Sequence, residues 1–203
     1  MNNELNWMMS EKTIVRKIAQ AGVQETFSKP ELVRVKQGEK MFFNAHINVE
    51  EMPAGKYLKK ATVFSNVPNG GTWEIISDEG TAVGGRGSAP SPIMYFATGL
   101  ALCMMSHVEM LAQQLNLNIK AKLEQKTSFS TTLNLGGIHP KDVFGKAESV
   151  EMHLLITTEE PLEKVEEFVR WCRQACMSLQ AVTQKTPASI SLKLNGTNLI
   201  EVS

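Results

Sequence analysis

The segment SAPSPIMYFATGLALCMMSHVEML, residues 88–111, is the most apolar stretch of this 203-residue chain. Ser91 is a natural N-cap and Pro92 a natural first helical residue, so the segment predicts a helix from Pro92 to about Leu115. The first four turns of this helix are apolar on nearly every side, and a helix of that kind must be covered by other elements. We therefore expect a buried central helix with a single cysteine, Cys103, near its middle.

Alternating apolar residues predict strands on both sides of this helix. The strand-like segments are residues 40–50, 59–67, 72–79, 117–125, 150–156 and 189–195. Short connections join the first three and predict an antiparallel meander, and the last should point Ile190 and Leu192 inward. A second long helix follows Pro161 and carries Cys172 and Cys176 on its apolar stripe. This order of elements predicts an α+β fold, with antiparallel sheets wrapped around two long central helices.

The first 40 residues have the pattern of a separate helical segment. Ser10 can cap a helix that runs from about Glu11 to Thr26 and has a narrow apolar stripe. We therefore predict two parts, an N-terminal helical extension at residues 1–40 and the main domain at residues 41–203.

Composition narrows the classes of function. Lys plus Arg and Asp plus Glu number 21 each, so the formal net charge is zero and predicts binding to neither nucleic acid nor membrane. The chain opens without the pattern of a signal peptide, and three cysteines are too few for a disulfide framework. We expect a cytoplasmic protein whose functional cysteines are reactive thiols rather than structural disulfides.

Two other motifs carry less information. His107 and Glu109 do not form a zinc motif, because Leu111 stands where the second histidine is needed. We therefore expect no metal site. Arg86 lies in the glycine-rich loop before the first long helix and is a candidate for closing over a substrate.

The cysteines offer the clearest chemistry. Cys172 and Cys176 lie one helical turn apart, and either can face Cys103 if the two long helices cross there. Two readings stay open, a redox pair or small apolar residues in a core. His107 lies one turn after Cys103, so it can activate the thiol or simply donate to a neighbouring group. Cys103 is too far from the helix N-terminus for the helix dipole to act on it, and burial should raise its pKa.

The segment APSPIMYFATGLALC, residues 89–103, resembles the family of osmotically inducible protein C and the organic hydroperoxide resistance proteins (OsmC/Ohr). In that family a proline opens a central helix and the reactive cysteine follows eleven residues later, which is the interval from Pro92 to Cys103. The segment WCRQACMSLQAV, residues 171–182, resembles the second family mark and places Cys176 in its cysteine position.

The resemblance implies an intertwined homodimer that reduces organic hydroperoxides and binds no cofactor. Cys103 would be the peroxidatic thiol and Cys176 the resolving thiol, and a dithiol of the lipoyl type would return the electrons. The family peroxidases carry a glutamate and an arginine beside the cysteine, but this chain has Ile93 and Met94 at the acid's position.

Arg34 and Arg86 are the arginines nearest to a plausible position for the family arginine, which keeps the reactive cysteine ionised.

The alternative function is that of a non-catalytic OsmC-like dimer that binds a hydrophobic small molecule in the apolar groove between the helices.

Overall fold

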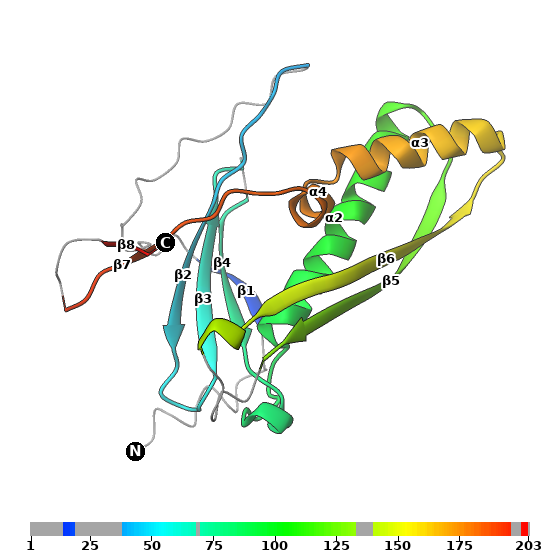
Figure 1. Ribbon diagram of the computed structural model, residues 1–203. Helices are drawn as coiled ribbons and strands as arrows, with labels where there is room; N and C mark the ends of the chain where they lie inside the picture. Colours follow the sequence, from blue (N-terminus) through cyan, green and yellow to red (C-terminus); the bar gives the residue numbers. More distant parts are fainter. Residues whose placement is uncertain (1–13, 19–37, 68–69, 133–139, 196–199, 203) are drawn as a thin grey trace. The chain divides into compact units, whose positions relative to one another are not determined.

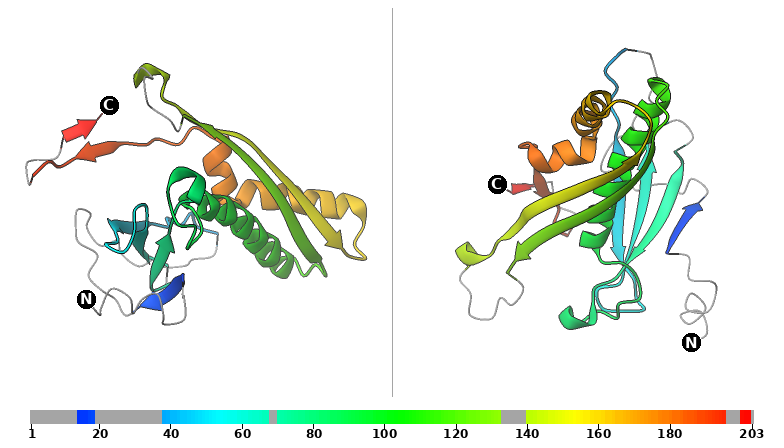
Figure 2. Two further views of the ribbon diagram at one scale, coloured as in Figure 1. Left: turned by 90° about the horizontal axis from the view of Figure 1, so that it is seen from below. Right: turned by 90° about the vertical axis from the view of Figure 1, so that its right-hand side faces the viewer.

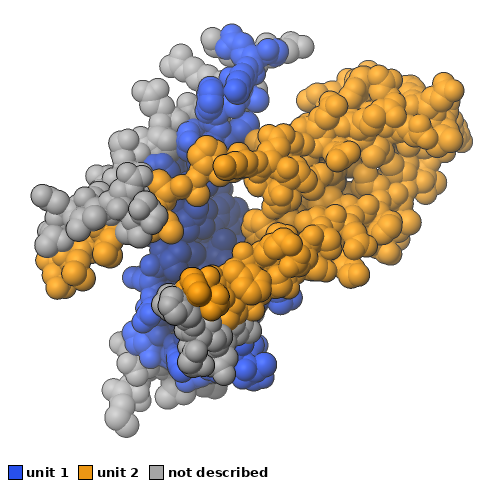
Figure 3. Space-filling view, in the orientation of Figure 1, with its two compact units in different colours: residues 1–95 blue, residues 96–203 orange. Residues whose placement is uncertain are grey.

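The structure is a computed structural model, and it describes residues 14–18, 38–67, 70–132, 140–195 and 200–202 (Figure 1). The chain forms two compact units, residues 1–95 and residues 96–203 (Figure 3). Antiparallel sheets and two long helices make up these units, so the predicted α+β class is confirmed.

The first unit contains a four-stranded sheet in the order β1-β4-β3-β2. Its strands are β1 (Val15–Ile18), β2 (Ala45–Glu51), β3 (Lys59–Ser65) and β4 (Thr72–Ser77). Every neighbouring pair is antiparallel, and in register Ala61 of β3 lies between Val49 of β2 and Ile75 of β4. The meander predicted from three β-branched and aromatic segments is therefore confirmed.

The N-terminal helix prediction is wrong where the structure can test it. Residues 15–18 form strand β1, which pairs with β4 through Val15 and Ile75 and through Arg16 and Glu74. The Arg16 guanidinium also makes an ion pair with the Glu74 carboxylate at 2.6 Å. Pairing with an existing sheet satisfies the backbone of this segment, which overrides a weak helical pattern. The other residues of that predicted helix lie outside the described part of the chain.

A buried carboxylate organises the glycine-rich loop after β4, which includes the short helix η1 (Thr81–Val83). Asp78 is only 1% exposed and accepts hydrogen bonds from the backbone N–H groups of Glu79, Arg86 and Ser88 and from the Ser88 hydroxyl. Burial raises the pKa of Asp78, but these hydrogen bonds outweigh it and the pKa lies below the ordinary value. The loop is therefore held in one shape, which fixes the chain as it enters the next helix.

The second unit contains most of helix α2 and everything that follows it. After α2 (Pro92–Gln114) come β5 (Lys120–Thr131), η2 (Pro140–Asp142), β6 (Gly145–Thr157), α3 (Leu162–Ala175), α4 (Met177–Thr183), β7 (Ile190–Leu192) and β8 (Ile200–Val202). β5 and β6 form a long antiparallel ribbon, and α2 and α3 lie on the same side of it (Figures 1 and 2). β7 and β8 form a separate two-stranded sheet.

The core of the second unit lies between this ribbon and the helices. Its buried residues are Met104, Val108, Ala112, Leu117, Phe168, Cys172 and Cys176. Leu123 of β5 and Met152 and Leu154 of β6 pack against it, as the alternation of the two strands predicts. Every second side chain of these strands therefore faces the core, and His153 lies on the exposed face of β6.

Helix α2 has the predicted bounds, but it is less covered than the sequence suggests. Only Leu100, Met104, Val108 and Ala112 are buried, one residue per turn along a single stripe. The apolar residues left at least 44% exposed are Ile93, Met94, Phe96, Leu102 and Met110. Among the described helices, α2 alone is long and apolar enough to cross a membrane, a property that core helices of soluble proteins share.

Two further expectations need correction. The second long helix is not continuous, because α3 ends at Ala175 and α4 begins at Met177, with Cys176 in an extended conformation between them (φ −68°, ψ 98°). The last predicted strand exists as β7, but Ile190 and Leu192 are 70% and 49% exposed, since among the described strands β7 pairs with β8 alone.

Candidate functional site

The candidate site joins α2 to the break between α3 and α4. Cys103 projects from the middle of α2 and is half-buried, whereas Cys176 is fully buried at the break. The two sulfurs and a ring nitrogen of His107 all lie within 4.8 Å of one another. All three cysteines are free thiols. The structure therefore brings together three of the five residues that the sequence singled out.

The break at Cys176 makes hydrogen-bond donors available. Cys176 N–H closes the last turn of α3 by donating to the Cys172 carbonyl at 3.0 Å, and the Cys176 carbonyl accepts from Gln180 of α4. The N–H groups at the start of a helix have no partner within it. The backbone N–H groups of Met177 and Ser178 are such groups, and both point to the sulfur of Cys103.

These donors set the acidity of Cys103. Burial raises its pKa, but hydrogen bonds from the Ser178 hydroxyl and N–H, the Cys176 thiol and the Met177 N–H lower it more, and the pKa lies below the ordinary cysteine value. The sequence-based expectation of a raised pKa is therefore wrong. That expectation considered only the dipole of α2, whereas the groups that stabilise the thiolate come from the start of α4.

His107 lies beside Cys103 in a defined orientation. Its Nδ1 atom is 2.8 Å from the backbone carbonyl oxygen of Cys103 and 3.8 Å from the Cys103 sulfur. A carbonyl oxygen can only accept, so Nδ1 carries the proton in this arrangement. His107 can therefore act toward the thiolate as a weak hydrogen-bond donor rather than as a base at Nδ1.

Cys172 lies one turn before Cys176 and is fully buried in the core. Burial and the neighbouring Cys176 raise the pKa of Cys172 to about 11. A thiol of this kind is almost entirely protonated at neutral pH and reacts slowly.

The described residues assign neither of the two predicted arginines to the site. Arg34 lies outside the described residues. Arg86 belongs to the first unit, where its side chain is exposed and its backbone N–H donates to Asp78 at 3.3 Å. Ile93 and Met94, at the position of the family glutamate, are 47% and 58% exposed on the first turn of α2.

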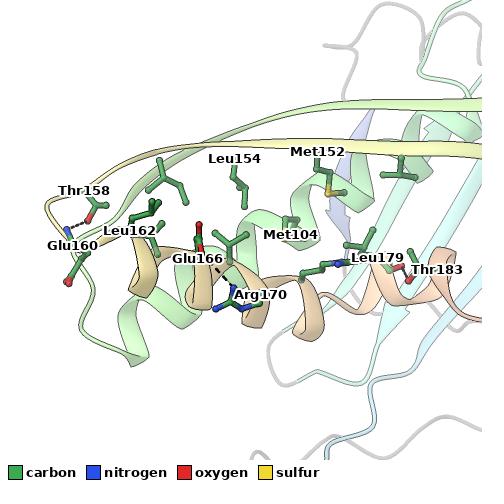
Figure 4. A pocket seen from close by; sticks show the side chains of 15 residues that line it. Met104, Met152, Leu154, Thr158, Glu160, Leu162, Glu166, Arg170, Leu179 and Thr183 are labelled. Atoms are coloured by element: carbon green, nitrogen blue, oxygen red, sulfur yellow. Dashed lines mark hydrogen bonds and ion pairs between the residues drawn. The ribbon is translucent and has the colours of Figure 1, made fainter.

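An apolar cavity of about 950 Å³ lies close to the site in the second unit. Figure 4 shows Met152 and Leu154 of β6 facing α3 across it, with Met104 of α2 and Leu179 of α4 in its walls. Arg170 and Glu166 line it from α3 and lie 4.0 Å apart. Met104, the residue after Cys103, lines this cavity, whereas Cys103 and Cys176 themselves are not among its lining residues.

Sequence reasoning missed two residues, one at the site and one in the loop before α2. Ser178 was overlooked because the helix was expected to continue through it, with its N–H bonded inside that helix. Asp78 was overlooked because an acidic residue after a strand is usually a surface residue. The available signal was the glycine-rich loop directly after Asp78, because such a loop can turn several backbone N–H groups toward one carboxylate.

A model of the OsmC-like protein family matches residues 85–191, which is just over half of the chain. The chain belongs to the OsmC-like family. The match includes Cys103, His107 and Cys176, so the candidate site lies within the family domain. A comparison with curated proteins finds no match.

Solved structures of OsmC-like proteins resemble this one at low sequence identity. An OsmC-like protein of unknown function from Vibrio cholerae is 11% identical, with a TM-score of 0.50 over 68% of this chain and 93% of that one. An OsmC-like hydroperoxide resistance protein from Jannaschia sp. CCS1 is 19% identical, with a TM-score of 0.49 over 79% of this chain and 97% of that one.

An organic hydroperoxide resistance protein from Elizabethkingia anophelis is also 19% identical, with a TM-score of 0.48 over 70% of this chain and 90% of that one. At such identities, likeness concerns the fold and leaves the chemistry to be argued from the site.

Proposed function

We propose that this OsmC-like chain is a thiol-dependent peroxidase that reduces organic hydroperoxides through Cys103 and Cys176. The observation that carries the proposal is the position of the Cys103 sulfur. It accepts hydrogen bonds from Ser178 and Met177, which lower its pKa, and it lies within 4.8 Å of the Cys176 sulfur. A nucleophile and a resolving thiol are therefore adjacent.

In the first step the Cys103 thiolate attacks the distal oxygen of a hydroperoxide. The O–O bond breaks, Cys103 becomes a sulfenic acid, and the alcohol leaves after taking up one proton. The same N–H and O–H donors that stabilise the thiolate then surround the new oxygen atom. Attack requires the thiolate, and these donors favour that form of Cys103.

In the second step the Cys176 sulfur attacks the sulfur of the sulfenic acid. A disulfide forms between Cys103 and Cys176 and one water molecule leaves. A dithiol of the lipoyl type then reduces the disulfide by exchange and becomes a cyclic disulfide itself. Both cysteines return to thiols, so each turnover consumes one hydroperoxide and one dithiol.

The apolar cavity favours a substrate with an alkyl chain. Its walls include Met104, Met152, Leu154 and Leu179, and burial of each methylene contributes about 0.8 kcal/mol. We expect alkyl or fatty hydroperoxides to be consumed faster than hydrogen peroxide, which gains nothing from this surface.

The proposal accounts for the missing family glutamate. In this chain the hydrogen bonds from Ser178 and Met177 supply the stabilisation of the thiolate. Arg34 and Arg86 remain the candidates for an added positive charge near Cys103. We also propose that the protein is cytoplasmic and that its active form is a homodimer. In a dimer, the second copy would bury the apolar residues that α2 leaves exposed.

The test is treatment of the reduced protein with one equivalent of cumene hydroperoxide, followed by thiol titration and mapping of the oxidised residues. Wild type should lose two thiols per chain and form the bond between Cys103 and Cys176. Cys103→Ser should abolish consumption, Cys176→Ser should accumulate the sulfenic acid, and Cys172→Ser should change little. Absence of oxidation at Cys103 under excess hydroperoxide would refute the peroxidase.

A second function has its own supporting observation. The cavity of about 950 Å³ has the size and the apolar lining of a small-molecule site. A non-catalytic OsmC-like dimer would use it to bind a hydrophobic ligand, with Cys103 and Cys176 as passive residues. Saturable binding of a fatty acid without any loss of thiols under hydroperoxide would favour this function.

A further inference from the structure

The side chains at the candidate site also have the composition of a metal site. Among the residues that the structure describes, Cys103, His107 and Cys176 are the one group of three or more metal-binding side chains whose ligand atoms lie together, all within 4.8 Å. We propose that these three residues bind one Zn²⁺ ion when both thiols are reduced. The sequence predicted no metal site, because it searched for ligands close together in the chain.

The geometry needs only a small contraction. Around a tetrahedral zinc ion, sulfur and nitrogen ligands at about 2.0–2.3 Å lie roughly 3.3–3.8 Å from one another. The Cys103 sulfur and the His107 Nδ1 atom are 3.8 Å apart already. Cys103 and His107 are four residues apart on α2, a spacing that puts two ligands on one face of a helix. Side-chain rotation at Cys176 can close the remaining distance.

The ligands suit zinc in type and in charge. Two thiolates and one imidazole are ligands that zinc binds well, with a fourth position open to water. Zn²⁺ with two thiolates and a neutral histidine has no net charge. A neutral complex is what a site with one buried and two half-buried ligands can accommodate, since burial of an unpaired charge is costly.

Groups around the ligands support this assignment. A metal bound at His107 Nδ1 displaces the proton that Nδ1 otherwise donates to the Cys103 carbonyl at 2.8 Å. The Ser178 hydroxyl lies 3.4 Å from the Cys176 sulfur, and its N–H points to Cys103. Hydrogen bonds of this kind orient metal ligands.

Zinc and hydroperoxide would compete for the same two sulfurs. A thiolate bound to Zn²⁺ is shielded from attack on a peroxide, and oxidation of either thiol removes a ligand and releases the ion. The protein would therefore hold zinc under reducing conditions and release it under oxidising ones. This inference stands on the three ligands and does not require the proposed peroxidase activity.

The test starts from untagged, metal-free protein reduced with a phosphine. Zn²⁺ is titrated against a chromophoric chelator, and Co²⁺ serves as a spectroscopic probe. We expect one ion per chain and, with Co²⁺, a near-ultraviolet charge-transfer band from thiolate ligands together with visible bands of tetrahedral intensity.

Variants identify the ligands. Cys103→Ser, Cys176→Ser and His107→Asn should each weaken zinc binding by more than the roughly 10–100-fold that loss of a second-shell partner costs. His153→Asn, on the exposed face of β6, and Cys172→Ala are the matched controls and should bind as wild type does. Circular dichroism of each variant checks that it is folded.

Three results would overturn the site. These are failure of folded wild type to bind Zn²⁺ at micromolar concentration, equal binding by the cysteine variants, and unchanged affinity in His107→Asn. Oxidation of Cys103 is measured separately on chelator-treated protein. A protein that is oxidised but binds no zinc refutes this inference alone, and one that binds zinc but resists hydroperoxide refutes only the peroxidase.

Discussion

The hydroxyl oxygen of Ser178 lies 3.4 Å from the sulfur of Cys176, and the same hydroxyl is hydrogen-bonded to the sulfur of Cys103. One serine therefore contacts both thiols of the candidate site. Because hydrogen bonds to a charged acceptor are stronger than those to a neutral one, Ser178 favours the thiolate form of Cys103.

Replacement of Ser178 tests this relationship. Ser178→Ala removes one of the donors, and we expect the pH midpoint for alkylation of Cys103 to rise, as loss of a hydrogen bond to a charged group predicts. Ser106→Ala is the control, because the Ser106 hydroxyl donates to the Leu102 carbonyl on the exposed side of α2. An equal rise in both variants would refute a specific role for Ser178.

His107 makes a separate prediction. His107→Asn removes the ring whose Nδ1 lies 3.8 Å from the Cys103 sulfur, and we expect a smaller rise in the same pH midpoint than Ser178→Ala gives. Measurements are made with a chelator present so that metal binding plays no part. His153→Asn should leave the midpoint unchanged, and a midpoint unchanged in both histidine variants would remove His107 from the activation of the thiol.

Asp78 should control the stability of the first unit. Asp78→Ala leaves several buried donors without an acceptor, and we expect the free energy of unfolding to fall by on the order of 3 kcal/mol in a urea titration. Asp142→Asn, at an exposed acid, should cost less than about 0.5 kcal/mol. Similar losses in the two variants would contradict a structural role for Asp78.

The same carboxylate predicts a dependence on pH. The pKa of Asp78 is lower in the folded state than in the unfolded chain, so its contribution to stability is complete above about pH 4 and is lost as the pH falls further. We expect the difference in unfolding free energy between wild type and Asp78→Asn to shrink below this pH. A difference that stays constant down to pH 2 would contradict the assignment.

The exposed side of α2 predicts association of two copies. Leu102 is 63% exposed, and Leu102→Glu should convert a dimer into a monomer at micromolar concentration in light scattering. Leu162→Glu is the control, since Leu162 is 72% exposed at the start of α3, where an acidic residue suits the helix N-terminus. A wild-type protein that is already monomeric would refute the dimer.

The sequence predicts the elements with strong local signals and misses those set by distant contacts. Ser91 and Pro92 define the start of α2, and the resemblance to the OsmC/Ohr family singles out Cys103 and Cys176. The break at Cys176 has no local signal, since neither glycine nor proline is near it and Met177 and Ser178 fit a helix. For β1, the spacing of Val15 and Ile18 fits one face of a helix but not one face of a strand, and the segment is a strand because it pairs with β4.

The two cysteines are neighbours in space although roughly 70 residues of chain separate them, including β5, β6 and α3. A covalent link between Cys103 and Cys176 would close that whole segment into a ring. A ring of this size removes conformational freedom from the unfolded chain and stabilises the folded state by about 4 kcal/mol in the chain-entropy model. The melting temperature would then report the redox state of the protein, with the oxidised chain harder to unfold, harder to digest with protease and slower to be cleared from the cell than the reduced one.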